Sequence, residues 1–71
     1  MNASAQQIVE FFDRNPDEEL LAIDVPVKFG GSLKNACDLL ADLLQSGLVK
    51  ARKETSPGGD SYDVYQPRSA T

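Results

Sequence analysis

The stretch that decides the fold is residues 32–49, which read SLKNACDLLADLLQSGLV. Ser32 can cap a helix at its start, and Gly47 can end it. Between them, apolar side chains recur at spacings of three and four residues and so share one face of a helix: Leu33, Ala36, Cys37, Leu40, Leu43 and Leu44. The stretch predicts an amphipathic helix over residues 33–46, with this apolar stripe buried. Cys37 is expected to be a core thiol.

Upstream, a capping box marks the start of another helix. Residues 4–7 read SAQQ, in which Ser4 can cap and Gln7 can reach back to it. Apolar residues then recur at helical spacing until Asn15-Pro16, where the proline pushes its predecessor out of the helical region. These features predict a helix over about residues 5–14.

A short strand and a short helix are predicted between these two helices. The apolar run LLAI at residues 20–23 is too short for a helix and fits a small strand. Asp24 is then a candidate N-cap, Pro26 suits a first helical turn, and Gly30 can end the segment. We expect this helix over about residues 25–29.

Downstream, the hydrophobic period changes from that of a helix to that of strands. Residues 48–54 and 61–66 alternate as strands do, and residues 55–60, TSPGGD, are rich in turn formers. The segment predicts a hairpin, to which the run LLAI can add a third strand. Pro67 is expected to end the hairpin, with residues 67–71 as a short flexible tail.

The composition excludes several kinds of site. The chain has 71 residues, one cysteine and no histidine. A lone thiol forms no internal disulfide and has no histidine with which to bind zinc, and the commonest general base of enzymes is missing. No phosphate-binding glycine motif is present either. We expect a single domain with a thin core that is not an enzyme and has no catalytic residues, metal or cofactor.

The start of the chain bears on its location. The first residues, MNASAQQ, have neither the basic end nor the apolar run of a signal peptide. No apolar stretch reaches the roughly 18 residues that a membrane span requires. The sequence therefore predicts a cytoplasmic protein that does not bind a membrane.

Charged residues are distributed unevenly along the chain, whose net charge is −4. Residues 1–27 carry six acids against one base, a net of −5, and residues 28–71 carry six bases against five acids, a net of +1. A surface that binds phosphates needs basic side chains gathered on one side. Five bases of the second part are candidates for such a surface: Lys28, Lys34, Lys50, Arg52 and Lys53.

The order of these elements resembles the winged helix-turn-helix family. The resemblance covers about residues 4–66, and its most specific part is LLQSGLV at residues 43–49, followed by basic residues and a glycine-rich hairpin. It implies an α+β fold that is mainly α, with three helices and a small two- to three-stranded antiparallel sheet in one domain over residues 1–71. The chain departs from the family twice: Pro26 stands where many members have alanine, and the hairpin tip lacks an arginine for the minor groove.

The resemblance implies a small DNA-binding transcriptional regulator, with helix 33–46 in the major groove and the hairpin 48–66 along the backbone. Eight residues are then candidates for contact with double-stranded DNA, either at base edges or at phosphates: Ser32, Lys34, Asn35 and Asp38, with Lys28, Lys50, Arg52 and Lys53. A two-fold DNA site calls for a homodimer, with the exposed part of helix 5–14 as its contact. The alternative is a winged-helix module that binds another protein and no DNA, for which acidity is no handicap.

Overall fold

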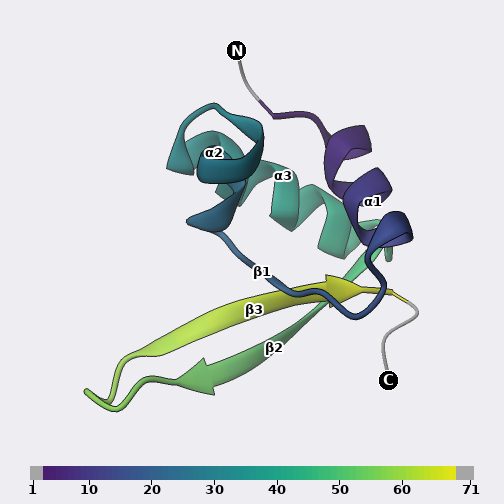
Figure 1. Cartoon of the computed structure of the whole chain (residues 1–71). Coiled ribbons are helices and arrows are strands. Elements are labelled where there is room, and N and C mark those ends of the chain that lie inside the picture. The colour runs from purple at the N-terminus through teal and green to yellow at the C-terminus, as the bar shows by residue number, and fades with distance from the viewer. Residues whose placement is uncertain (1–2, 69–71) are drawn as a thin grey trace.

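The computed structural model describes residues 3–68 and shows an α+β fold (Figure 1). Its elements follow one another in the expected order: α1 (Ala5–Arg14), β1 (Leu20–Leu21), α2 (Asp24–Phe29), α3 (Leu33–Gln45), β2 (Val49–Thr55) and β3 (Ser61–Pro67). The three helices and the three-stranded antiparallel sheet confirm the predicted fold class and are consistent with a winged helix. Within the described residues, no helix is long and apolar enough to cross a membrane.

Local chemistry sets the ends of α1 and α3 as expected. At the start of α1, the Ser4 hydroxyl accepts a hydrogen bond from the Gln7 amide at 3.3 Å, and the Gln7 side chain accepts one from the Ser4 amide at 2.9 Å. At the start of α3, the Ser32 hydroxyl accepts a hydrogen bond from the Asn35 amide at 3.0 Å. Gly47 has a φ of +77°, a conformation that L side chains rarely adopt, and this lets the chain turn sharply after α3.

Asp24 does not cap α2 in the way that the sequence predicts. The helix includes Asp24 as its first residue, and the N-cap position is Ile23, which makes no side-chain cap. The Asp24 carboxylate instead accepts a hydrogen bond from the Leu21 amide at 2.9 Å and so ties the end of β1 to α2. Because Ala22 and Ile23 form the turn between the two elements, the strand covers two residues and not all four of LLAI.

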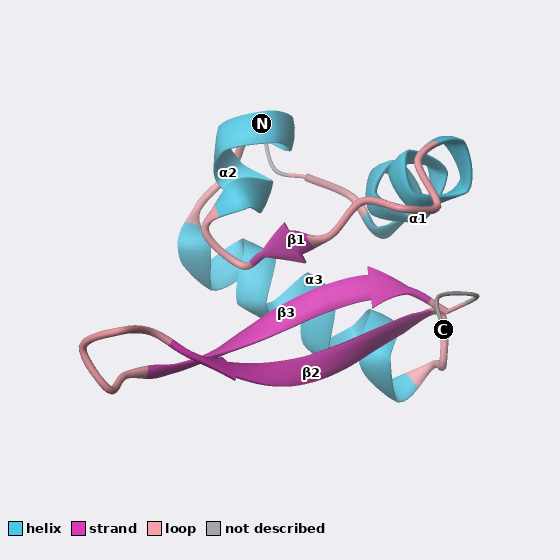
Figure 2. Ribbon diagram, turned by 60° about the horizontal axis from the view of Figure 1, so that its bottom comes forward, coloured by secondary structure: helices cyan, strands magenta, loops and turns pink. Residues whose placement is uncertain are grey.

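The sheet has the strand order β1-β3-β2, so its central strand is the last one in the chain (Figure 2). Leu20 of β1 pairs with Tyr65 of β3, which confirms the expected third strand. β3 extends to Pro67, which is buried and lies opposite Val49 at the start of β2. The prediction of a flexible tail from residue 67 is therefore wrong for Pro67, because a proline can close a strand where no further amide is needed. Residues 69–71 of that predicted tail lie outside the described part of the chain.

The core lies where the helices meet one face of the sheet (Figure 1). Its largest fully buried side chains come from four different elements: Ile8 of α1, Leu20 of β1, Val25 of α2 and Leu40 of α3. Complete burial of one such aliphatic side chain contributes about 1.5–3 kcal/mol to stability. Since each element supplies one of these side chains, the stability of the core depends on all four.

The buried face of α3 is narrower than the sequence predicts. Half of the predicted apolar stripe is buried, and the other half is exposed: Leu33, Cys37 and Leu44. At 100° per residue, these three lie together at one edge of the stripe. The short neighbouring elements cover the other side of the stripe, with Ala36, Leu40 and Leu43, and leave that edge uncovered. The predictions that Cys37 is a core thiol and that Leu33 and Leu44 are buried are therefore wrong.

We expect Cys37→Ser to change the free energy of unfolding by less than about 0.5 kcal/mol, because substitutions at exposed positions have small effects. Urea denaturation of the wild type and the variant, followed by circular dichroism, measures the difference. The folded wild type should also react with a maleimide at Cys37 without prior unfolding. A loss above about 1.5 kcal/mol together with a thiol protected from maleimide would show that Cys37 is packed in the core.

Candidate functional site

The exposed edge of α3 forms an apolar surface beside the wing, the hairpin made by β2 and β3. Four exposed residues of α3 follow one another at spacings of four, four and three, which places them on one side of the helix. The first two also line a hollow of 360 Å³, whose other side is formed by residues 21–23 and by β3. We call this set the α3–wing surface: Leu33, Cys37, Ala41 and Leu44 of α3, with Ile23 and Tyr65 across the hollow.

Large apolar side chains of this surface are open to solvent. Ile23, Leu33 and Leu44 have exposed fractions of 60%, 51% and 44%. Tyr65 is half-buried, and its pKa is raised by that burial and, to a smaller extent, by the negative charge of Asp63. An apolar region of this kind, gathered where a helix meets a hairpin, is typical of a binding surface.

The charged side chains that border the α3–wing surface are largely paired within the chain. Lys34 Nζ lies 3.1 Å from Asp38 Oδ2, one turn along α3. Across the wing, Lys53 Nζ lies 3.4 Å from Asp63 Oδ1. Asp42 follows Asp38 by one further turn of α3 and adds a negative charge. The border therefore carries three acidic and two basic side chains, and both basic ones are in ion pairs.

The opposite face of the wing carries a polar network over a buried valine. The Arg52 guanidinium donates hydrogen bonds to Glu54, at 2.6 Å, and to Glu19, which precedes β1. The side-chain amide of Gln66 donates a hydrogen bond from Nε2 to the same Glu19 carboxylate at 3.0 Å. Val64 pairs with Arg52 in the sheet and is buried, although it lies outside the main core cluster. This Arg52 network therefore joins the start of β1 to the wing.

The Arg52 network lowers the pKa of Glu19. Hydrogen bonds from Arg52 and, to a smaller extent, from Gln66 hold the pKa of this carboxyl below its ordinary value of 4.5. The same ion pair raises the pKa of Arg52 further above its usual range. Because the pKa of Glu19 is depressed in the folded state, its contribution to stability is present above the ordinary pKa. That contribution is lost as the pH falls through the folded-state pKa.

We therefore expect the Glu19→Gln variant to be less stable than the wild type at neutral pH, and the difference to shrink as the pH falls below the ordinary pKa of 4.5 and to disappear below the lowered folded-state pKa. Glutamine keeps the shape of the side chain but carries no charge for Arg52. Thermal denaturation followed by circular dichroism at several pH values measures this convergence. Glu18→Gln is the matched control outside the network and should follow the wild type. If the melting temperatures of Glu19→Gln and the wild type differ by the same amount at every pH, the lowered pKa of Glu19 is contradicted.

The basic residues predicted to contact DNA already have contacts within the chain. Lys34, Arg52 and Lys53 are in ion pairs, and Lys28 Nζ lies 5.6 Å from the centre of the Phe11 ring. Alternation along β2 places Lys50 on the same face of the wing as Arg52, and Lys53 on the other face. The five bases are therefore not gathered on one face.

The polar residues predicted to contact DNA at the start of α3 differ in exposure and in the contacts they make. The Ser32 hydroxyl serves as the cap of α3, where its oxygen accepts a hydrogen bond from the Asn35 backbone amide. Asn35 is partly buried, and its Oδ1 is buried without a hydrogen-bond partner. Lys34 and Asp38 are exposed and paired with each other. Of the predicted site residues on α3, the structure brings only these two into contact by their side chains.

The residues of the α3–wing surface were missed because the sequence assigns them to the core. Leu33, Cys37 and Leu44 belong to the predicted buried stripe. Ala41 is not part of that predicted stripe. The signal that points to them is the width of the apolar face. With Ala41 included, the apolar side chains occupy more of the circumference of α3 than the short elements packed on it, α1, α2 and β2, can cover.

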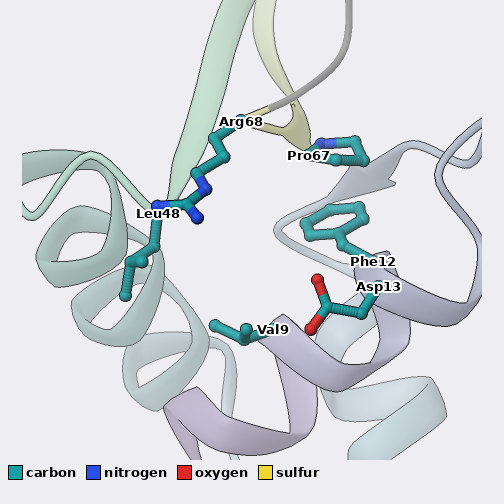
Figure 3. Close-up of a pocket in the computed structure, with 6 residues that line it drawn as sticks. All are labelled: Val9, Phe12, Asp13, Leu48, Pro67 and Arg68. Atoms are coloured by element: carbon teal, nitrogen blue, oxygen red, sulfur yellow. The ribbon is translucent and has the colours of Figure 1, made fainter.

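A second hollow, of 260 Å³, lies between α1, the start of β2 and the end of β3 (Figure 3). Its lining is apolar except for two charged side chains: Val9, Phe12, Leu48 and Pro67, with Asp13 and Arg68. Figure 3 shows Asp13 of α1 and Arg68, the residue after β3, at the hollow. Within residues 3–68 there is no group of three or more His, Cys, Asp or Glu side chains that could hold a metal ion.

The fold and its surface define a small α+β domain, consistent with a winged helix, that exposes an apolar helix edge beside its wing. Comparisons with protein-family models, with curated proteins and with solved structures found no match. A function for the chain is therefore inferred from its own residues.

Proposed function

We propose that this chain is a non-catalytic protein-interaction module that binds a protein partner through the α3–wing surface. The observation that carries the proposal is the exposure of Ile23 and Leu33 at the hollow between α3 and the wing, and of Leu44 farther along the same side of α3. Burial of apolar surface is the dominant favourable term in most protein association. Charged residues are depleted at the centre of protein interfaces, and the centre of this surface is apolar.

The pairing of the basic residues also favours a protein partner. Lys34, Arg52 and Lys53 each contact a carboxylate of the chain. To bind a phosphate, each would exchange an existing ion pair for a new one. The gain in binding free energy is therefore smaller than for an unpaired base. The net charge of −4 adds a long-range repulsion between the chain and DNA.

One observation favours DNA binding as a second candidate function. The Lys34 side chain, in the first turn of α3, is 85% exposed. This is the part of the helix that meets base edges in helix-turn-helix complexes. In this second candidate the chain is a transcriptional regulator, Lys34 leaves Asp38 to contact a guanine, and Lys50 and Arg52 contact the phosphate backbone.

A titration with DNA separates the two functions. We expect no change in the anisotropy of a labelled mixed-sequence duplex at low salt, with protein up to about 100 µM, the weak end of non-specific DNA affinities. Saturable binding that weakens in the Lys34→Ala variant would overturn the protein-interaction proposal in favour of the second candidate.

A photo-crosslinking amino acid at position 44 tests the protein partner in cells that produce the chain. We expect a discrete protein adduct from position 44 and none from position 6, an exposed site on α1. Leu33→Glu in the same molecule should abolish the adduct, because it buries an unpaired charge in the interface. An adduct that forms equally from both positions, or that persists with Leu33→Glu, would contradict the proposal.

A further inference from the structure

We infer that the partner binds with an amphipathic helix whose apolar stripe is bordered by lysine or arginine. This inference rests on the proposed function, because it names the partner element that the α3–wing surface fits. Three features of the surface lead to it: its contour along α3, the charge of the adjacent strand edge, and the charge of its border.

The contour of the surface fits the side chains of a helix. Two small residues, Cys37 and Ala41, lie between the larger Leu33 and Leu44 along α3. A large side chain of a partner helix can insert between residues spaced in this way, as a knob enters a hole. Leu33 and Leu44 are 11 residues apart. That separation is about 16 Å along the axis, or three turns, which a partner helix of similar length can cover.

A strand is a poorer fit than a helix. The strand order leaves β2 at one edge of the sheet, and its Lys53 pairs with Asp63 at the hollow. Four of its five central residues are charged, and the segment reads KARKE over residues 50–54. Charged side chains on an edge strand oppose the pairing of another extended chain. The partner is therefore expected to pack against side chains and not to add a strand.

The charges at the border select a basic partner. Asp38 and Asp42 follow one side of the apolar edge of α3, and Asp63 lines the hollow on the wing. The two bases nearby, Lys34 and Lys53, already neutralise one acid each. A lysine or arginine beside the partner's apolar stripe can reach Asp42 and share Asp38, which fixes the orientation of the helix.

The same charges disfavour a second copy of this chain as the occupant. A two-fold contact through α3 would bring Asp38 and Asp42 of both copies to one interface. Each copy also has a net charge of −4. Like charges at close range oppose association. We therefore expect the chain alone to sediment as a monomer.

Three fluorescein-labelled peptides of about 18 residues, long enough to form a helix on binding, test the inference. The first has a leucine stripe at helical spacing flanked by lysines, the second has glutamates in place of the lysines, and the third is a scramble of the first. Fluorescence anisotropy with the full chain should show the first binding about tenfold or more tighter than either of the others. Its binding should weaken with added salt, because charges contribute.

Two pairs of matched variants locate the bound peptide. Ala41→Arg should reduce the affinity for the basic peptide about tenfold or more by blocking the centre of the surface, whereas Gln6→Arg on α1 should leave it unchanged. Asp42→Asn should reduce it about threefold, whereas Asp17→Asn in the loop before β1 should not. The bound peptide should also slow the alkylation of Cys37. Circular dichroism melts confirm that each variant is folded.

The possible outcomes separate this inference from the proposed function. Equal binding of the basic and scrambled peptides, or no protection of Cys37, would overturn the basic helix as the partner element. If the acidic peptide binds best and protects Cys37, the surface still binds protein and only the inferred partner chemistry is wrong. If no peptide binds while duplex DNA does, both the inference and the proposed function fail. Dimerisation of the chain through this surface would also overturn the inference.

Discussion

Leu40→Ala should reduce the free energy of unfolding by about 2–5 kcal/mol, the usual cost of a large-to-small change at a buried site. Leu40 is fully buried in the centre of α3 and packs in a core to which every helix contributes. A domain of 71 residues is expected to have a total stability of about 4–11 kcal/mol. The variant should therefore be largely unfolded at moderate urea concentrations where the wild type is folded.

Leu44→Ala is the matched control for this change. It removes the same atoms from the same helix, but Leu44 is 44% exposed and lies outside the core. We expect a loss of less than about 1 kcal/mol, because no closed cavity forms. Urea denaturation followed by circular dichroism measures both variants. Equal losses for Leu40→Ala and Leu44→Ala would mean that the two faces of α3 are buried to the same extent.

Leu20→Ala should have an effect of similar size, about 2–5 kcal/mol, although it lies in a strand of only two residues. Leu20 is among the largest fully buried side chains, and its burial holds β1 against β3. Loss of this anchor should also free the β1 segment from the sheet. We expect faster amide hydrogen exchange at Leu21, whose amide is held by Asp24.

Ile23→Ala tests the same apolar run at an exposed position. Ile23 is 60% exposed and lies on the α3–wing surface. The substitution should change the stability by less than about 1 kcal/mol. It should instead weaken binding of the basic amphipathic peptide. A large stability loss from Ile23→Ala, with none from Leu20→Ala, would show that the run LLAI packs in the opposite register.

These contrasts connect the size of the domain with its surface. A chain of this length buries only about 60% of the surface that its unfolded form exposes. The helices and the wing are too short to cover the whole apolar face of α3, so one edge remains open to solvent. The same shortage of covering elements that leaves Leu33 and Leu44 exposed also makes them available to a partner.

The ends of the elements could be predicted from the sequence because the interactions that set them are local. The capping box of Ser4 and Gln7, the cap of Ser32 and the turn at Gly47 each involve residues within about four positions of one another. Periodicity is equally local, so the helices, the hairpin and the α+β class were all predictable. The third strand followed from the resemblance and from the length of the run LLAI.

The tertiary structure alone decided which apolar and charged side chains meet. Cys37 and Leu40 belong to one apolar stripe in the sequence, yet only Leu40 is covered, because burial depends on elements far away in the chain. Arg52 looks like a phosphate ligand in the sequence, and its pairing with Glu19, 33 residues away, is visible only in the fold. A cap or a turn is a property of neighbouring residues, whereas burial and ion pairing depend on how the elements pack. The α3–wing surface belongs to the second kind.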